Sequence, residues 1–417
     1  MIIRDYSERI KLCLIDDRSF KSNFFAVNVI IPLDKSNVTE SVLLPNVMIR
    51  GTKSCPDIEA LSRKLSLLYG ASLYADAVKK NDNLVLSFSV RFVKDRFSLN
   101  GEKIAADAVG LLFEMLSSPC FESNVFKSEY TESELKNLRD RIDAEINDKR
   151  RYVLKSLIAN LCKDEPFGIS ANGYKEDLEK ITPETLTKRY REIMANSKIF
   201  AFFFGECDEN VICEGLFSAF DKQSPFSEAV SEAKTPCGEP QFIKEEMAIT
   251  QAKLAIGFKA GSLEGYTPAE TGLFNAVYGS GATSKLFENV REKLSLCYYC
   301  ASRVYRQKGI MTVDSGVEIE KYETAYNEIL SQLNDVANKR ITEREFVSAK
   351  NAMRNVYNSL KDSFFALHDW YLSCFIAGDI YTPDEITELI DVAEADRIAE
   401  IASLFKPQTV YLLSPKK

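Results

Sequence analysis

The sequence predicts an α+β protein made of two duplicated domains, each a mostly antiparallel sheet with helices packed on one face. The first observation is length, because 417 residues are more than one hydrophobic core usually contains. The second is that strand-like apolar runs are interleaved with long amphipathic helical patterns in both halves. The third is an internal repeat: the tetrapeptide Lys-Leu-Ser-Leu begins at Lys64 and again at Lys293, which is 293 − 64 = 229 residues later. A repeat this long indicates two domains of one fold, since solenoid repeats are much shorter.

One predicted helix of the first half has apolar residues that recur at helical spacing. Pro56 lies near its start and Gly70 at its stop, and the apolar positions are Ile58, Leu61, Leu65 and Leu68. The elements expected after it are a strand at 84–90 (LVLSFSV), a long charged helix at about 121–150, a short helix opened by Ile181-Thr182-Pro183-Glu184, and a strand at 199–205 (IFAFFFG).

The second half repeats this order. Its expected elements are a strand at 310–317 (IMTVDSGV), a long helix at about 342–374, a helix at 393–404, and a strand at 409–413. Residues 223–240, rich in Ser, Pro, Glu and Ala and without an apolar period, are read as a linker. The predicted domains are therefore 1–222 and 241–417.

Composition argues against nucleic acid and membrane partners. The net charge of −8 leaves no basic footprint, and the short basic group Lys149-Arg150-Arg151 is interpreted as a solvated helix face. Charges near the N-terminus interrupt any signal-peptide core, and the densest apolar run, 199–205, is too short to span a bilayer. We therefore expect a cytoplasmic protein whose ten cysteines are reduced thiols.

One Cys-x-x-Cys motif occurs, Cys297-Tyr298-Tyr299-Cys300. A structural zinc ribbon needs a second such pair, and a thioredoxin-like site needs the motif to open a helix. This motif lies in a predicted strand, where residues three apart point to opposite faces. We therefore expect neither a metal nor a redox role for it.

The chain has one histidine, His368, and this count excludes more chemistry than any motif establishes. Most zinc peptidases need two imidazoles, and Ser-His-Asp or Cys-His hydrolases need a histidine beside the nucleophile. His368 shares a helical stripe with Phe364, Tyr371 and Phe375, which predicts a packing role.

Two segments carry a family resemblance. One starts at Ser41 (SVLLPNVMIRGTKSCPDIEALSRKLSLLYGASLYADA) and the other at Ser284 (SKLFENVREKLSLCYYCASRVYRQKG). Together with the duplication, they resemble the insulinase/pitrilysin metallopeptidases, and most closely a bacterial branch without the zinc motif. The resemblance implies a processing-peptidase-like fold of two domains.

Active members of that family carry His-x-x-Glu-His on the first helix, with a more distant glutamate as third ligand. Alignment on Gly51-Thr52 places Val42 and Asn46 at the two histidines and Pro45 at the general base. We expect no metal site in this chain, and we expect Pro45 to disturb the helix. The distal glutamate would fall near Arg141 or Glu145, between which the sequence does not decide.

The second segment matches the family in an Arg and a Tyr that reach the scissile bond, here Arg291 and Tyr298. A guanidinium and a phenol can donate to the oxyanion of peptide hydrolysis without reorganising. The alternative is an exposed helix-end cation and a core aromatic on a strand. Before them, the loop containing Gly279, Ser280 and Gly281 either cradles substrate backbone or serves only the turn.

These observations lead to a functional hypothesis. The chain would be the zinc-free subunit of a heterodimer, binding peptide and supplying Arg291 and Tyr298 to a His-x-x-Glu-His partner that carries the zinc. Two alternatives stay open: a module that binds peptides or a client protein without catalysis, and a purely structural partner.

Overall fold

The computed structural model describes residues 1–16, 19–206, 208–229 and 231–416. Contacts divide the chain into two compact units, one built from Met1–Ala144 and Ile169–Val230 and the other from Glu145–Gly168 and Ser231–Lys417. Residues 145–168 thus have their contacts in the second unit, although they precede the predicted linker. Residue 230 of that linker lies outside the described residues; the rest of 223–240 contains neither helix nor strand.

The first unit is organised around a six-stranded sheet. Its strand order is β1 (Ile2–Asp5), β2 (Ile10–Ile15), β8 (Lys198–Phe204), β3 (Ser22–Pro32), β5 (Asn83–Val93) and β4 (Ser72–Lys80). Only β2 and β8 run parallel; every other neighbouring pair is antiparallel. The sheet is therefore mostly antiparallel, as the sequence predicts.

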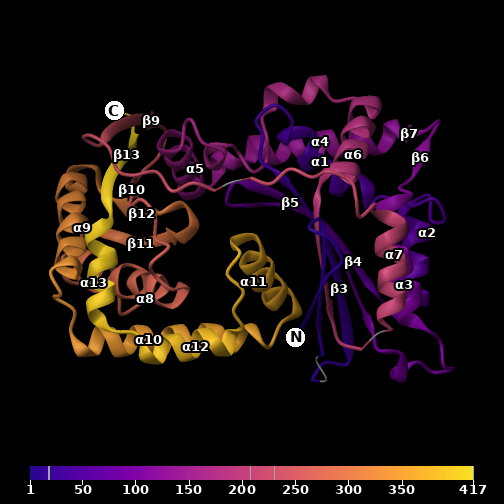
Figure 1. Cartoon of the computed structure of the whole chain (residues 1–417). Helices are drawn as coiled ribbons and strands as arrows, with labels where there is room; N and C mark the ends of the chain where they lie inside the picture. Colours follow the sequence, from indigo (N-terminus) through magenta and orange to yellow (C-terminus); the bar gives the residue numbers. More distant parts are fainter. Residues whose placement is uncertain (17–18, 207, 230, 417) are drawn as a thin grey trace. The chain divides into compact units, whose positions relative to one another are not determined.

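Helices of the first unit share an apolar core with this sheet. They are α1 (Val38–Met48), α2 (Ile58–Leu67), α3 (Ile104–Ser117), α4 (Ser128–Ala144), α6 (Pro183–Asn196) and α7 (Glu209–Ala219). Alternate residues of β3, such as Phe25 and Val27, are fully buried in one cluster with Leu112 of α3 and Leu216 of α7. Figure 1 shows α3 and α7 alongside the strands of this sheet.

The second unit repeats the same topology. Its five-stranded sheet has the order β11 (Cys297–Tyr305), β12 (Ile310–Val317), β10 (Ala252–Lys259), β13 (Lys406–Pro415) and β9 (Gln241–Met247). Read from the other edge, β9-β13-β10-β12-β11 corresponds to β2-β8-β3-β5-β4, and again only one pair, β13 with β9, is parallel. This correspondence confirms the duplication.

Helices cover both faces of part of the second sheet. One group, which includes α8 (Pro268–Tyr278), α9 (Tyr322–Ala337) and α13 (Ala395–Leu404), buries apolar side chains against Leu254 and Leu412. The neighbouring strand residues Ala255 and Leu413 face the other way and pack against α5 (Lys149–Leu161). The remaining helices are the π-helix η5 (Leu286–Lys293), α10 (Glu343–Leu360), α11 (Phe364–Ala377) and α12 (Pro383–Val392).

Short elements complete the two units. They are the hairpin strands β6 (Phe121–Glu122) and β7 (Val125–Phe126) and the 3-10 turns η1 (Asp95–Phe97), η2 (Glu145–Asn147), η3 (Pro166–Gly168), η4 (Lys175–Lys180), η6 (Arg306–Lys308) and η7 (Ile319–Lys321). No helix among the described residues is both long and apolar enough to cross a bilayer.

The four apolar strands that the sequence predicts are confirmed as β5, β8, β12 and β13, but both predicted long helices are wrong in their extent. The stretch 121–150 begins with the β6–β7 hairpin, whose turn needs left-handed backbone at Ser123 and Asn124, and α4 then ends at Ala144. Asp148 caps the start of α5 by accepting a hydrogen bond from the Arg151 amide. The stretch 342–374 is interrupted before Ser363, which caps α11 in the same way.

Candidate functional site

The positions of the missing zinc motif lie on a buried helix. Val42 is 1% exposed, Pro45 is buried and Asn46 is half-buried, all within α1. The predicted disturbance at Pro45 is wrong, because α1 runs without interruption from Val38 to Met48. A proline inside a helix costs about 3 kcal/mol. Most α1 side chains are buried, so packing offsets this cost.

Zinc does not fit these residues. Val42 has no lone pair, Pro45 has no titratable group, and the Asn46 amide donates to the Val42 carbonyl at 3.5 Å. Throughout the described ranges, no three His, Cys, Asp or Glu side chains gather as a metal ion would require. The N-terminal unit therefore offers no counterpart of the family's metal chemistry.

A charged pair joins the end of this helix to α4. Arg50, eight residues after Val42, places its Nε 3.3 Å from Glu134 Oε1 and donates from Nη2 to Ser133 Oγ at 3.0 Å. Glu134 is largely buried, with 10% of its side chain exposed. The Arg50 guanidinium is thus the cationic partner of the Glu134 carboxylate, which points from α4 toward the end of α1.

Neither Arg141 nor Glu145, the two residues near which the sequence puts the distal glutamate, lies beside Arg50 as Glu134 does. Glu145 lies in η2 of the other unit and pairs with Lys155, and Arg141 is exposed in the last turn of α4. Nothing in the sequence distinguishes Glu134 from the other acidic residues of α4, because the pairing with Arg50 is tertiary.

Arg291 lies in the π-helix η5, a conformation that is rare and frequent at functional sites. Its side chain is 41% exposed, with Nε 3.3 Å from Glu292 Oε1 and Cζ 4.5 Å from the centre of the Phe287 ring. The guanidinium is thus braced by its own helix while one side stays open to solvent.

Tyr298 is the second residue of β11 and is 69% exposed. The turn before it includes Ser295, which adopts left-handed backbone with φ 48°. A β-strand aromatic of a core would be buried, so the core alternative does not describe this side chain. Arg291 near the end of a helix and Tyr298 at the start of the next strand are placed as the sequence predicts.

The glycine loop before η5 is tied into the protein by its own backbone. The Gly279 carbonyl accepts from the Ser302 amide at 3.0 Å, and the Ser280 amide donates to the Asn275 carbonyl at 2.8 Å. A Cβ at Gly279 would lie 2.5 Å from Ser302 Oγ, whereas Gly281, at φ 124°, is exposed and faces open space. These bonds give the loop a turn function; binding of substrate backbone by Ser280 and Gly281 stays a prediction.

The Cys-x-x-Cys motif departs from the expected alternation. In the pairing with β12, Cys297 lies opposite Val317 and Cys300 opposite Ser315, so three steps on β11 match two on β12. This β-bulge brings both thiols to the buried side, with 8% and 6% exposure. The prediction that the two cysteines point to opposite faces is wrong, because the extra residue shifts the phase of the strand.

Tyr299 belongs to a cationic cluster that sequence reasoning missed. The Arg150 Cζ lies 4.4 Å from its ring centre and the Lys253 Nζ lies 5.5 Å away. Arg150 also forms a bidentate pair with Asp314, in which Nη2 donates to Oδ1 at 3.2 Å. The interpretation of Arg150 as part of a solvated helix face is therefore incomplete. Burial first, and then the charge of Arg150, lower the pKa of Lys253.

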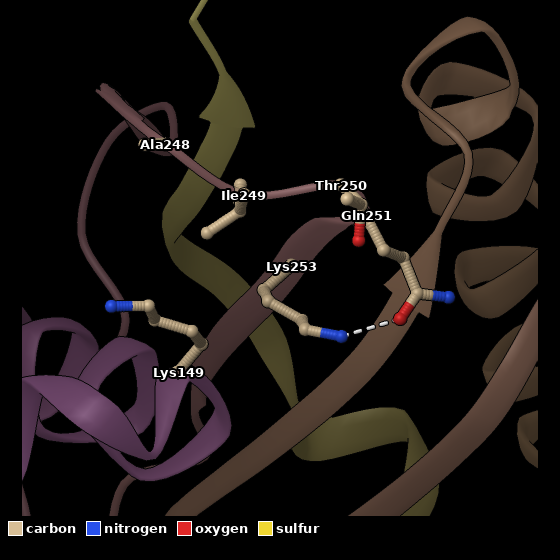
Figure 2. Close-up of a pocket in the computed structure, with 6 residues that line it drawn as sticks. All are labelled: Lys149, Ala248, Ile249, Thr250, Gln251 and Lys253. Carbon is tan, nitrogen blue, oxygen red and sulfur yellow. Dashed lines mark hydrogen bonds between the residues drawn. The ribbon is translucent and has the colours of Figure 1, made fainter.

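A shallow pocket of about 600 Å³ opens beside this cluster. Figure 2 shows its lining residues, which are Lys149, Ala248, Ile249, Thr250, Gln251 and Lys253. The Lys253 ammonium donates to the Gln251 side-chain oxygen and leaves two further N–H donors. Lysine and hydroxyl donors with one apolar wall suit an acidic group carried on a peptide.

Comparison with known proteins agrees with this architecture. Residues 180–353 match the family model described as "Peptidase M16 inactive domain". The "Probable inactive metalloprotease YmfF" of Bacillus subtilis (strain 168) is 30% identical over 405 residues, which cover 96% of this chain and 94% of that protein. This chain belongs to the M16 (insulinase/pitrilysin) peptidase family.

Two further similarities are more distant. The "Uncharacterized zinc protease YmxG" of the same organism is 23% identical over 74% of this chain and 75% of its own length. A crystal structure of a conserved protein from Enterococcus faecalis V583 has a TM-score of 0.90 and 24% identity, and covers 100% of this chain and 98% of that one. The latter similarity establishes the fold alone. The sequence of this M16 chain lacks His-x-x-Glu-His, in agreement with the matched family model and the Bacillus subtilis relative, both of which are named inactive.

His368, the one histidine of the sequence, lies on α11 and is 8% exposed. Phe364, Tyr371 and Phe375, which share its stripe, are buried to a similar degree. The burial agrees with the packing role that the sequence predicts for the one histidine of this M16 chain.

Proposed function

We propose that this chain is the zinc-free subunit of a heterodimeric M16 peptidase. In this role it binds the peptide substrate and provides Arg291 and Tyr298 to the active site of a His-x-x-Glu-His partner. The observation that carries the proposal is the exposure of Tyr298, since 69% of it is open to solvent on a sheet whose next strand, β12, is buried along its whole length. Leaving a large aromatic exposed forgoes about 2 kcal/mol of burial, which a binding or catalytic role would explain.

The chemistry of the pair suits acyl transfer. Attack on a peptide carbonyl builds negative charge on oxygen, and a phenol O–H and a guanidinium N–H can donate to it. Neither group needs to lose or gain a proton for this role. Arg291 is carried by a π-helix and Tyr298 follows a turn with left-handed backbone at Ser295, so both side chains start from defined backbone, which would limit the reorganisation needed when the charge develops.

Three further observations support the proposed partnership, its compartment and its peptide substrate. Bacillus subtilis has relatives of both kinds, one named inactive and one named a zinc protease, so a single cell can contain both types of chain. The cysteines among the described residues are free thiols, which suits a reducing compartment. The lysines of the pocket beside Tyr299 would attract acidic parts of a peptide.

The proposal is tested by gentle purification of the protein from its own cell, followed by mass spectrometry of the chains that copurify. Recovery of a near-stoichiometric homologue with His-x-x-Glu-His supports the heterodimer. Recovery of the protein alone, or with a client protein and no zinc homologue, contradicts it and favours a peptide-binding module. A purely structural partner would copurify too, but turnover by the pair would then not depend on Arg291 or Tyr298.

A further inference from the structure

The bulge in β11 brings two thiols within reach of one covalent bond. Cys297 and Cys300 lie opposite Val317 and Ser315, two residues apart on β12. Two residues of a strand span about 6.7 Å. The Cα atoms of the two cysteines are therefore about that far apart, within the range of roughly 4.4–6.8 Å that disulfides require. A regular strand would have pointed the two side chains away from each other.

The two thiols are also electronically unequal. The pKa of Cys297 is lowered to about 7, first by a hydrogen bond from Cys300. Burial opposes this shift, whereas a hydrogen bond from Ser315 and the positive charge of Arg291 add to it. The same hydrogen bond and burial raise the pKa of Cys300. Cys297 is thus the thiol of the pair that ionises more readily, and Cys300 is the one that holds its proton more tightly.

We propose that Cys297 and Cys300 form a redox-active dithiol, which closes to a disulfide by exchange with a low-molecular-weight disulfide. The Cys297 thiolate attacks one sulfur of that molecule, so that a mixed disulfide forms and one small thiolate leaves. Cys300 then loses its proton and attacks the Cys297 sulfur, and the second small thiolate leaves. In the balance, the protein loses two hydrogens and gains one S–S bond, while the small disulfide is reduced to two thiols.

Access to Cys297 comes from its place at the end of an edge strand. It is the first residue of β11, which lies at the edge of its sheet, and the turn before it is exposed, with Leu294 at 45%. Strand ends of this kind open locally at a small cost in free energy, so a small reagent can reach the sulfur. The exposed Cys237 provides an internal control, since the nearest cysteine in the sequence, Cys213, is 237 − 213 = 24 residues away.

The disulfide would act on the residues between its two ends. Tyr298 and Tyr299 lie inside the ring that the bond closes, so oxidation would fix the bulge on which Tyr298 is displayed. An effect of that change on turnover by the heterodimer rests on the proposed function, whereas formation of the disulfide does not.

The test uses the full-length protein, fully reduced and then incubated with oxidised glutathione, followed by peptide mapping under acid quench. We expect the peptide with residues 297–300 to lose two hydrogen masses, while Cys237 gains glutathione. In Cys300→Ser, Cys297 should retain glutathione because no second thiol resolves the adduct; in Cys297→Ser, Cys300 should stay unmodified. Both are conservative changes at buried positions, and thermal unfolding of each variant shows whether it is folded.

A free dithiol at residues 297–300 in wild-type molecules whose Cys237 carries glutathione would overturn the proposal. So would equal glutathione labelling of the two single variants, because the unequal roles of the thiols would then be wrong. Neither outcome depends on a zinc partner, so failure here is distinct from failure of the heterodimer, which is tested by copurification and turnover.

Discussion

Glu165 carries the electrostatic anchor that holds residues 145–168 to the second sheet. Its carboxylate lies 2.9 Å from Lys259 Nζ and 3.1 Å from Lys308 Nζ, and Lys308 is 2% exposed. The glutamate side chain itself is 5% exposed. Removal of this one charge would leave two buried ammonium groups without their carboxylate.

Glu165→Gln keeps the size of the side chain and removes the charge. Breaking a buried ion pair from one side costs about 3–5 kcal/mol, and we expect the free energy of unfolding to fall by about that amount. In a unit of this size, such a loss lowers the melting temperature by roughly 10 °C. The matched control is Glu145→Gln, because Glu145 pairs with the more exposed Lys155 and should lose at most about 1 kcal/mol. Urea unfolding followed by circular dichroism measures both variants.

The pH dependence gives a second check. Burial raises the pKa of Glu165, but hydrogen bonds from Lys259 and Lys308 outweigh it, so the folded-state pKa is lowered. The stabilisation is therefore complete above the unfolded pKa of about 4.3 and is lost as the pH falls through the folded value. The difference between wild type and Glu165→Gln should be constant from pH 6 to 7 and shrink below about pH 4. A difference under about 1 kcal/mol at pH 7, or one that grows with acid, would refute the reasoning.

Three further substitutions, the first with a matched control, test other features of the protein. Gly309→Ala should cost about 3 kcal/mol or more in unfolding free energy, because φ is 56° and the new Cβ would meet the Gly261 carbonyl oxygen at 1.9 Å. Gly101→Ala, at φ 79° but in open space, should cost only about 1 kcal/mol, and thermal unfolding compares the two. Tyr298→Ala should change the unfolding free energy by less than about 0.5 kcal/mol, since most of the side chain is in solvent; a large loss would show that it packs in the protein. Lys253→Met should weaken binding of an acidic peptide by about fivefold, corresponding to ~1 kcal/mol, and leave a neutral peptide unaffected in calorimetric titration.

The sequence predicts the strands well because they are short, apolar and bounded by polar residues. The run IFAFFFG became β8, with every residue from Ile199 to Phe204 buried, and IMTVDSGV became β12 to the residue. The duplication follows from two similar segments, and the matching strand orders confirm it. These features depend on local pattern, which a sequence displays directly.

The remaining features depend on tertiary contacts or on backbone phase. The apolar side chains of residues 149–161 pack against the second sheet, and this contact is tertiary, so local periodicity does not show it. The partnership of Arg50 with Glu134 joins residues 84 positions apart, 134 − 50 = 84, and leaves no local signal. One extra residue in β11 reverses the expected facing of Cys300, because a strand has a period of two and a bulge resets it.

The most direct test of the account is turnover by this protein together with its zinc-bearing homologue. Arg291→Ala is compared with Arg303→Ala, which removes the same charge from an exposed position on β11, and the zinc content of each preparation is measured. Loss of one donor to a transition-state oxyanion lowers kcat by about 100- to 1,000-fold. We expect a fall of this order for Arg291→Ala, with unchanged zinc and near-normal turnover for Arg303→Ala. Equal turnover by wild type and Arg291→Ala would contradict it.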